Sequence, residues 1–161
     1  MHTSTPIIAI DGTAASGKGT LAKRLAAHLD FGYLDTGLLY RRVAMDLMDR
    51  GVAWDNPETA TEAAIMMDPA RLDDPRLRGA EAGRGASVVA AIPAVRDALM
   101  EFQRAFPFRC GKAGAVLDGR DIGTAFFPDA DLKFYSDAGL EVRAARRHAE
   151  LTAKGDSITL E

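Results

Sequence analysis

Short, mostly apolar runs occur at four places along the chain, at residues 6–11, 32–35, 115–118 and 132–135. The first run, PIIAID, is rich in isoleucine and lacks polar alternation, which is typical of a strand buried on both faces of a parallel sheet. Between the runs, apolar residues recur at the spacing of a helix with one buried face. The pattern predicts an α/β fold, a three-layer α/β/α sandwich whose parallel sheet has the strand order 2-3-1-4.

The same periodicity predicts helices at residues 20–29, 38–50, 57–67, 80–91, from residue 93 onward, and at 137–154. In the first helix, Leu21, Leu25 and Leu29 recur every four residues and are expected to form its buried stripe. Gly83 and Gly85 are expected to weaken the fourth helix, because glycine is a poor helix former.

Polar residues mark several helix boundaries. Asn56 has the properties of an N-cap, and Pro57 those of a first-turn residue. Asp137 is expected to cap the last helix, and Gly155 to end it. Residues 68–79 contain two prolines and many charges, and we interpret them as a loop.

The composition is that of an ordinary globular protein, with 47% apolar and 27% charged residues in a chain of 161. A net charge of -3 argues against a protein that coats nucleic acid. The single cysteine, Cys110, fits a reducing compartment. The amino terminus does not resemble a signal peptide, and no run approaches the roughly 18 apolar residues of a membrane helix. We expect a cytoplasmic, single-domain monomer without nucleic-acid or membrane partners.

A glycine-rich segment between the first strand and the first helix has the pattern of a phosphate-binding loop, or P-loop. It comprises Gly12, Thr13, Ala14, Ala15, Ser16, Gly17, Lys18, Gly19 and Thr20. Glycines let the backbone wrap closely around phosphates at a helix N-terminus. Lys18 supplies a positive charge for the terminal phosphates, and Thr20 is a candidate Mg²⁺ ligand. Gly19 separates these two residues, whereas the general pattern places Ser or Thr directly after the lysine.

The alternative is a glycine-rich turn without a ligand. The strand before the segment and the amphipathic helix after it are the context that a P-loop requires, so we favour the P-loop. It predicts a nucleoside triphosphate, ATP, as ligand.

Acidic residues and arginines follow two further predicted strands. Asp35 ends one strand and is followed by Arg41, while Asp118 ends another and is followed by Arg120 and Asp121. Ligands bind at the carboxyl ends of parallel strands in open α/β sheets. The arginines are candidates to grip a second phosphate, and Asp35 and Asp118 to position Mg²⁺. Taken singly, each acid could equally be a capping residue, and each arginine a solvated surface charge.

Three arginines lie on the last predicted helix, Arg143, Arg146 and Arg147. Such a face is usually solvated. Beside a P-loop, the alternative is a lid that covers the triphosphate and spreads the charge of the transition state.

With these segments in place, the sequence resembles the bacterial cytidylate kinases, which are P-loop nucleoside monophosphate kinases. The resemblance is carried by IDGTAASGKGT, YLDTGLLYR, ASVVAAIPAVRDAL and, most distinctively, VLDGRDIGTAFFPDADLKFY. It runs from about residue 7 to 155. It implies a P-loop NTPase fold, with about 52–110 as the insert that binds the monophosphate and about 137–161 as a partial lid.

The resemblance also implies residue roles. ATP with Mg²⁺ would be held by residues 12–20 and Arg146. The acceptor, CMP or dCMP, would be bound by Thr36, Arg41, Ser87, Arg96, Arg120 and Asp121, of which Ser87, Arg96 and Asp121 would read the cytosine. Lys18, Arg41 and Arg120 would act in the chemical step. No catalytic base is needed, because the CMP phosphate is already a nucleophile.

One departure concerns the end of the chain, because members of this family continue for several dozen residues and add a final edge strand. We therefore expect an exposed sheet edge. We expect weak or absent turnover if the chain is naturally this short, and an ordinary CMP kinase if the natural chain is longer. The rivals are a P-loop kinase for another small acceptor, such as shikimate or dephospho-coenzyme A, and an ATP-binding domain without turnover.

Overall fold

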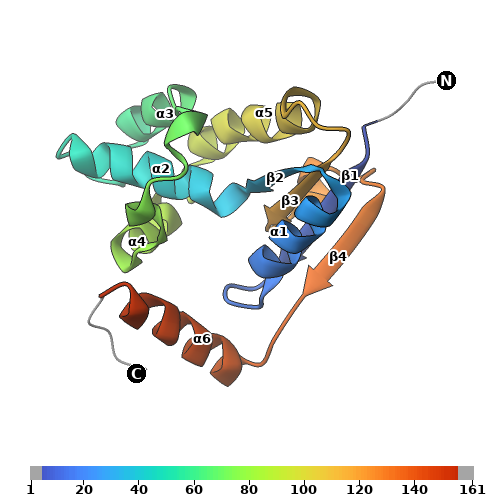
Figure 1. Ribbon diagram of the computed structural model, residues 1–161. Coiled ribbons are helices and arrows are strands. Elements are labelled where there is room, and N and C mark those ends of the chain that lie inside the picture. Colours follow the sequence, from blue (N-terminus) through green and yellow to red (C-terminus); the bar gives the residue numbers. More distant parts are fainter. Residues whose placement is uncertain (1–4, 156–161) are drawn as a thin grey trace. The chain divides into compact units, whose positions relative to one another are not determined.

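The computed structural model in Figure 1 describes residues 5–155. Within them the chain forms two compact units. The sheet unit contains residues 5–36 and 103–150, and the helical unit contains residues 37–102 and 151–155. The end of the predicted partial lid, about 137–161, lies outside the described residues. Among the described residues, none of the helices is both long and apolar enough to span a membrane.

The sheet unit is built on four parallel strands, β1 (Ile7–Gly12), β2 (Gly32–Asp35), β3 (Ala115–Gly119) and β4 (Leu132–Ser136). Their order is β2-β3-β1-β4, which confirms the predicted α/β fold and strand order. Since all strands run in one direction, the carboxyl ends of β1, β2 and β3 lie at the same end of the sheet. Figure 1 shows the chain leaving β1 there to form the P-loop and α1 (Lys18–Leu29).

Helix α1 packs on one face of the sheet mainly through two alanines. Ala22 and Ala26 are the buried residues of this helix and pack with Ile8, Ile10 and Val116. Of the predicted leucine stripe, the middle residue, Leu25, packs against this cluster, whereas the outer leucines are 46% and 39% exposed, so the prediction was wrong for those two. The alanines have the same four-residue spacing, and their small side chains let the helix lie close to the sheet.

A π-helical turn, η3 (Ile122–Phe126), packs on the other face of the sheet. A Cβ at Gly123 would lie 3.4 Å from Ala9 of β1, so the two backbones lie close together. Arg104 in helix α5 (Pro93–Arg109) donates to the carbonyl of Ala125. Strand β4 forms one edge of the sheet, and its Leu132 is 52% exposed.

The helical unit contains α2 (Thr36–Asp49), α3 (Pro57–Ile65), η1 (Pro69–Arg71), η2 (Pro75–Arg78) and α4 (Ala80–Val89), together with part of α5. One cluster of its buried residues joins α2, η2 and α4 through Met45, Leu77 and Ala82. The first residue of α2, Thr36, belongs to the sheet unit.

The helical unit tests three of the predictions made from the sequence, of which one is confirmed and two are wrong. Asn56 caps α3 as predicted, because its side chain accepts a hydrogen bond from the Thr59 N–H. Residues 68–79 are not a plain loop, since Asp68 and Asp74 cap the short 3₁₀ turns η1 and η2. In α4, a Cβ at Gly85 would lie 2.7 Å from both Ala44 and the Trp54 ring. That glycine is therefore needed for close packing rather than being a weak point.

The last helix, α6 (Leu140–Ala153), begins later than predicted, and Asp137 is not its cap. The first helical bond instead runs from the Arg143 N–H to the carbonyl of Gly139. The Asp137 carboxylate accepts hydrogen bonds from the Thr13 hydroxyl and the Ala138 N–H, each at 2.8 Å. The acid therefore ties the end of β4 to the P-loop.

Candidate functional site

The P-loop (residues 12–20) leaves β1 in a conformation that its glycines make possible. A Cβ at Gly12 would collide with the Ser136 backbone of β4. Gly17, the residue before α1, has a φ of 97°, which favours glycine over other residues. The predicted strand, glycine-rich turn and helix are therefore present, and the loop runs into the N-terminus of α1. That end of a helix attracts anions.

Basic side chains surround the backbone of this loop. The Lys18 Nζ lies 3.2 Å from the carbonyl oxygen of Thr13. From α6, the Arg146 guanidinium donates to the carbonyls of Ala15 and Ser16, at 3.4 and 3.3 Å. The structure thus places Lys18 and Arg146 together at the P-loop, and their role in holding ATP stays a prediction.

Two arginines next to Arg146 on α6 differ in their surroundings. Arg143 donates to the carbonyl of Ala138 and, at 3.5 Å, to that of Ala14. Arg147 pairs with Glu150 on its own helix at 3.1 Å. The predicted lid face is therefore divided, with Arg143 and Arg146 at the P-loop and Arg147 in a local ion pair.

The two acids predicted to position Mg²⁺ lie on neighbouring strands. Asp35 of β2 and Asp118 of β3 are partners in the parallel register. Asp118 is only 3% exposed. Burial, and secondly the charge of Asp35, raise the pKa of Asp118 to about 6. A hydrogen bond from the Tyr33 hydroxyl, at 2.6 Å, opposes this rise.

Neighbouring groups connect this acid pair to the P-loop. A Cβ at Gly19 would lie 3.7 Å from the Asp118 carboxylate, so the start of α1 passes directly beside it. Thr36 is buried, and its hydroxyl donates to the backbone carbonyl of Asp118 at 2.9 Å. In this structure Thr36 therefore joins the ends of β2 and β3.

The segment after β3 is fixed to the end of β1 by Asp11. Its carboxylate accepts hydrogen bonds from the N–H groups of Ile122 and Gly123, at 2.7 and 2.8 Å. Asp121 has a φ of 60°, and its backbone carbonyl accepts the bonds that close η3. The exposed side chains of Arg120 and Asp121 are thereby held on a rigid turn.

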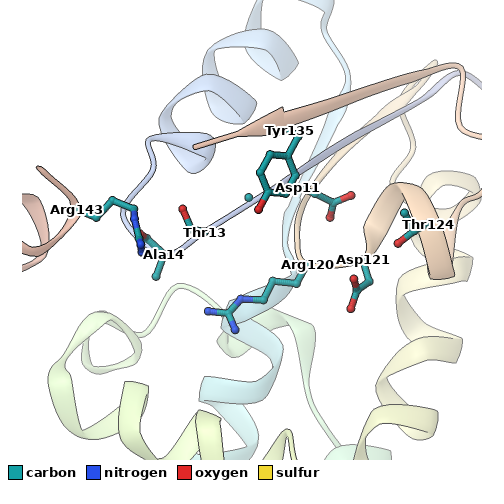
Figure 2. A pocket seen from close by; sticks show the side chains of 9 residues that line it. Asp11, Thr13, Ala14, Arg120, Asp121, Thr124, Tyr135 and Arg143 are labelled. Carbon is teal, nitrogen blue, oxygen red and sulfur yellow. The ribbon is translucent and has the colours of Figure 1, made fainter. Parts of the chain in front are cut away.

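A pocket of about 450 Å³ lies between this turn and the P-loop. Figure 2 shows its lining residues, Asp11, Gly12, Thr13, Ala14, Arg120, Asp121, Thr124, Tyr135 and Arg143. Two arginines from different elements, one after β3 and one on α6, thus contribute to one cavity together with the P-loop. The volume lies in the range of small-molecule sites, and the arginines suit an anionic ligand.

The remaining predicted substrate residues belong to the helical unit. Arg41 on α2 donates to the carbonyls of Leu77 and Gly79. Ser87 is exposed on α4, and its hydroxyl donates to the Gly83 carbonyl at 3.2 Å. Arg96 is exposed on the first turns of α5. The roles predicted for these residues stay predictions.

The sequence reasoning missed several residues that the structure brings to the site. Asp11 could have been found, because it ends a predicted strand as Asp35 and Asp118 do. The hydrogen bond that Tyr33 makes could not have been predicted, because its acceptor, Asp118, lies 85 positions away along the chain. Nor did any local pattern predict that Thr124 and Tyr135 line the pocket.

Comparison with known proteins agrees with this geometry. The sequence model of the family described as "Cytidylate kinase" matches residues 8–161. A curated cytidylate kinase from Rhodopseudomonas palustris (strain ATCC BAA-98 / CGA009) is 55% identical over 93% of this chain and 70% of that protein. One from Acidiphilium cryptum is 54% identical over 92% and 69%. A crystal structure from Thermus thermophilus is 22% identical and has a TM-score of 0.44, covering 98% of this chain and 83% of that one. The family match and the identity to the two curated relatives show that the chain belongs to the cytidylate kinase family.

Proposed function

We propose that this protein transfers the γ-phosphoryl group of ATP to CMP or dCMP, giving ADP and CDP or dCDP. The observation that carries the proposal is the pocket between the P-loop and the turn after β3, which contains both Arg120 and Arg143. In a member of the cytidylate kinase family, such a pocket suits the phosphates that take part in the transfer. The family match also favours this reaction over a P-loop kinase for another small acceptor.

In the transfer, a phosphate oxygen of CMP attacks the γ-phosphorus of ATP. A new P–O bond forms while the bond between the γ-phosphorus and the bridging oxygen breaks, and that oxygen leaves with ADP. The P-loop backbone, Lys18 and Arg146 would hold the triphosphate. Thr36, Arg41 and Arg120 would contact the acceptor phosphate and its surroundings. Catalysis would then rest on positioning and on neutralising charge, without a protein base.

The residues present fit a Mg²⁺ ion. The described residues contain no cluster of three or more His, Cys, Asp or Glu that could hold a metal by itself. Mg²⁺ does not need one, because it is usually bound through one or two carboxylates plus substrate phosphates and water. Asp35, Asp118 and Thr20 would hold the ion, which would neutralise charge on the transferred phosphoryl group. A cation would also offset the burial and, secondly, the Asp35 charge that together raise the pKa of Asp118.

Selection of the cytosine is proposed for Ser87, Arg96 and Asp121. Cytosine presents an amino donor and ring acceptors, which suit a carboxylate or hydroxyl acceptor and a guanidinium donor. A different base would leave polar groups of the site unpaired. We also propose that residues 52–110 form the monophosphate-binding insert and that residues 137–161 belong to the lid. Monomeric state, cytoplasmic location, and the lack of nucleic-acid and membrane partners stay predictions.

Release of ADP from ATP and Mg²⁺ tests the function in the purified chain, with CMP, dCMP, UMP or no acceptor. We expect release that CMP or dCMP stimulates and that Lys18→Ala abolishes. Lys112→Ala is the matched control, because it removes an exposed lysine that pairs with Asp30 of the same unit. Acceptor-independent release, or stimulation by shikimate or dephospho-coenzyme A instead of CMP, would refute the proposed reaction. ATP binding without any turnover would support the rival of a binding domain.

A further inference from the structure

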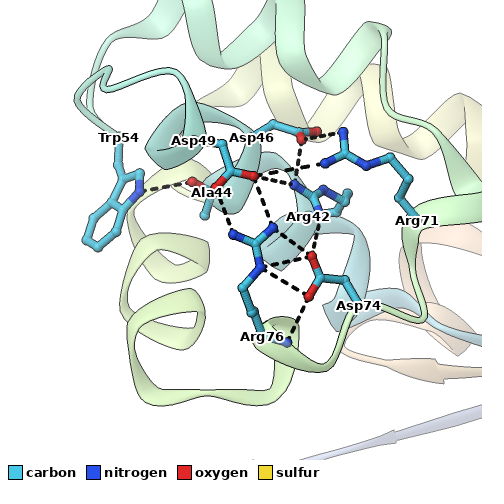
Figure 3. Close-up of polar contacts among 8 residues, drawn as sticks. All are labelled: Arg42, Ala44, Asp46, Asp49, Trp54, Arg71, Asp74 and Arg76. Carbon is cyan, nitrogen blue, oxygen red and sulfur yellow. Dashed lines mark hydrogen bonds and ion pairs between the residues drawn. The ribbon is translucent and has the colours of Figure 1, made fainter.

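A cluster of charged side chains in the helical unit surrounds one fully buried arginine. Figure 3 shows this cluster, which we name the Arg42 cluster, and which consists of Arg42, Asp46, Asp49, Arg71, Asp74 and Arg76. The Arg42 side chain is 0% exposed, although arginine is rarely buried completely. It approaches Asp46 at 2.5 Å, Asp74 at 3.2 Å and Asp49 at 3.5 Å. The three acids balance the three arginines in charge.

Burial makes the Arg42 cluster different from a set of surface ion pairs. A buried cation is costly unless it is paired, so loss of one partner is felt strongly. The Arg42 Nε is buried and has no hydrogen-bond partner within residues 5–155, so this guanidinium depends on its other nitrogens. Those nitrogens bond to Asp46 on α2 and to Asp74 at the start of η2. The cluster therefore joins the long helix α2 to the short turn η2.

Asp74 is the residue through which the cluster holds η2. One of its carboxylate oxygens accepts a hydrogen bond from the Arg76 N–H at 2.9 Å and so caps the turn. The Arg76 guanidinium bonds to Asp74 and extends to Asp49 on α2 at 2.8 Å. Hydrogen bonds from Arg76 lower the pKa of Asp74 to about 2, so this carboxylate is charged at neutral pH. The start of η2 is thus fastened to α2 by charge-assisted bonds.

The far end of η2 contacts Arg41, the residue before Arg42. One Arg41 nitrogen, Nη1, lies 2.7 Å from the Leu77 carbonyl oxygen and 3.3 Å from that of Gly79. Consecutive residues of a helix point about 100° apart. Arg42 is directed into the cluster, while Arg41 reaches the carbonyls at the end of the turn. If η2 moved relative to α2, the carbonyls that orient Arg41 would move with it.

We propose that Asp74 and Arg42 are positioning residues for the acceptor nucleotide, because they fix η2 against α2 and so orient the Arg41 guanidinium. The inference rests on the proposed function, in which Arg41 binds the CMP phosphate. It goes beyond that function by giving a binding role to residues that touch neither nucleotide. The competing explanation is that the Arg42 cluster only stabilises the helical unit.

Titration calorimetry with CMP and with ATP on Asp74→Asn separates these explanations. Asparagine keeps a carbonyl oxygen that can cap η2 but removes the charge that faces Arg42 and Arg76. We expect the Kd for CMP to rise about tenfold, the size of effect typical within one coupled network, while the Kd for ATP changes less than about twofold. Arg50→Ala is the matched control, since it removes the exposed Arg50–Glu62 pair of the same unit. It is expected to leave both constants unchanged.

Arg76→Gln is a second variant in case Asp74→Asn does not fold. Arg76 is 49% exposed, and glutamine would lose its bonds to Asp49 while leaving Arg42 paired. The expected result is again a selective rise in the Kd for CMP. Equal binding of CMP by the variants and the wild type, or an equal loss of CMP and ATP affinity, would overturn the inference alone. A wild-type chain that does not bind CMP would overturn the proposed function and this inference with it.

Discussion

Replacement of Asp118 by asparagine is expected to stabilise the ligand-free protein increasingly as the pH rises. Asp118 is 3% exposed, and its folded-state pKa is about 6 instead of the ordinary 3.8, first because of burial and second because of Asp35. Between these two values the folded protein keeps a proton that the unfolded chain has released. The free energy of unfolding of the wild type therefore falls as the pH rises from about 4 to about 6, and stays low above that range.

The size of this loss follows from the pKa difference. A change from 3.8 to about 6 corresponds to about 3 kcal/mol of unfolding free energy, as an order of magnitude for this buried group. Asparagine has no proton to release, and its carbonyl oxygen can still accept the bond from Tyr33. We therefore expect the difference in unfolding free energy, variant minus wild type, to grow by about 3 kcal/mol between pH 4 and pH 8.

Urea unfolding of both proteins across this pH range, in EDTA to exclude metal ions, measures the difference. Comparing its change with pH removes the constant effect of the substitution itself. Asp129→Asn is the control, because its exposed side chain should change the unfolding free energy by less than about 0.5 kcal/mol. A difference between Asp118→Asn and wild type that stays flat from pH 4 to pH 8, or that shrinks, would show that Asp118 is not a strained buried acid. The same variant is expected to lose CMP-dependent ADP release, a cost in function for a gain in stability.

Two further substitutions test neighbouring features. Tyr33→Phe removes the hydrogen bond that lowers the pKa of Asp118, so the pH-dependent loss of stability should extend to higher pH. The same urea series measures this, and an unchanged pH range would contradict the assigned bond. Gly85→Ala should destabilise the helical unit by about 1–3 kcal/mol through overpacking against Ala44 and Trp54, despite the better helix propensity of alanine. A gain in thermal stability would show that the site has room. Gly139→Ala is the control, because a Cβ there would meet none of the described residues within 4 Å.

Local patterns predicted the elements that depend on local chemistry. Strand β1, the P-loop and α1 follow one another within 23 residues, so spacing and residue type were sufficient to place Lys18 close to a helix start. The helix begins at Lys18, two residues earlier than predicted. Asn56 was recognised as a cap because its hydrogen-bond partner lies three residues away. The strand order 2-3-1-4 was also predicted, and the sheet has it.

Prediction from local sequence patterns failed where a residue or a helix could make two different sets of contacts. The leucine stripe and the Ala22–Ala26 stripe of α1 have equal spacing, and only packing on the sheet shows which is buried. Asp137 stands where an N-cap would be expected, yet the Thr13 hydroxyl, 124 positions away, competes for its carboxylate. A hydrogen bond to a distant partner leaves no periodic trace in the sequence.

The sequence by itself therefore determined the phosphate-binding loop, the strand ends that carry Asp35 and Asp118, and the family to which the chain belongs. Tertiary structure decided how these pieces act on one another. Only folding places Asp118 out of water beside another acid, and directs the Asp11 carboxylate to the amides after β3. Burial and electrostatic interactions depend on distance in space, which the order of residues along a chain does not specify.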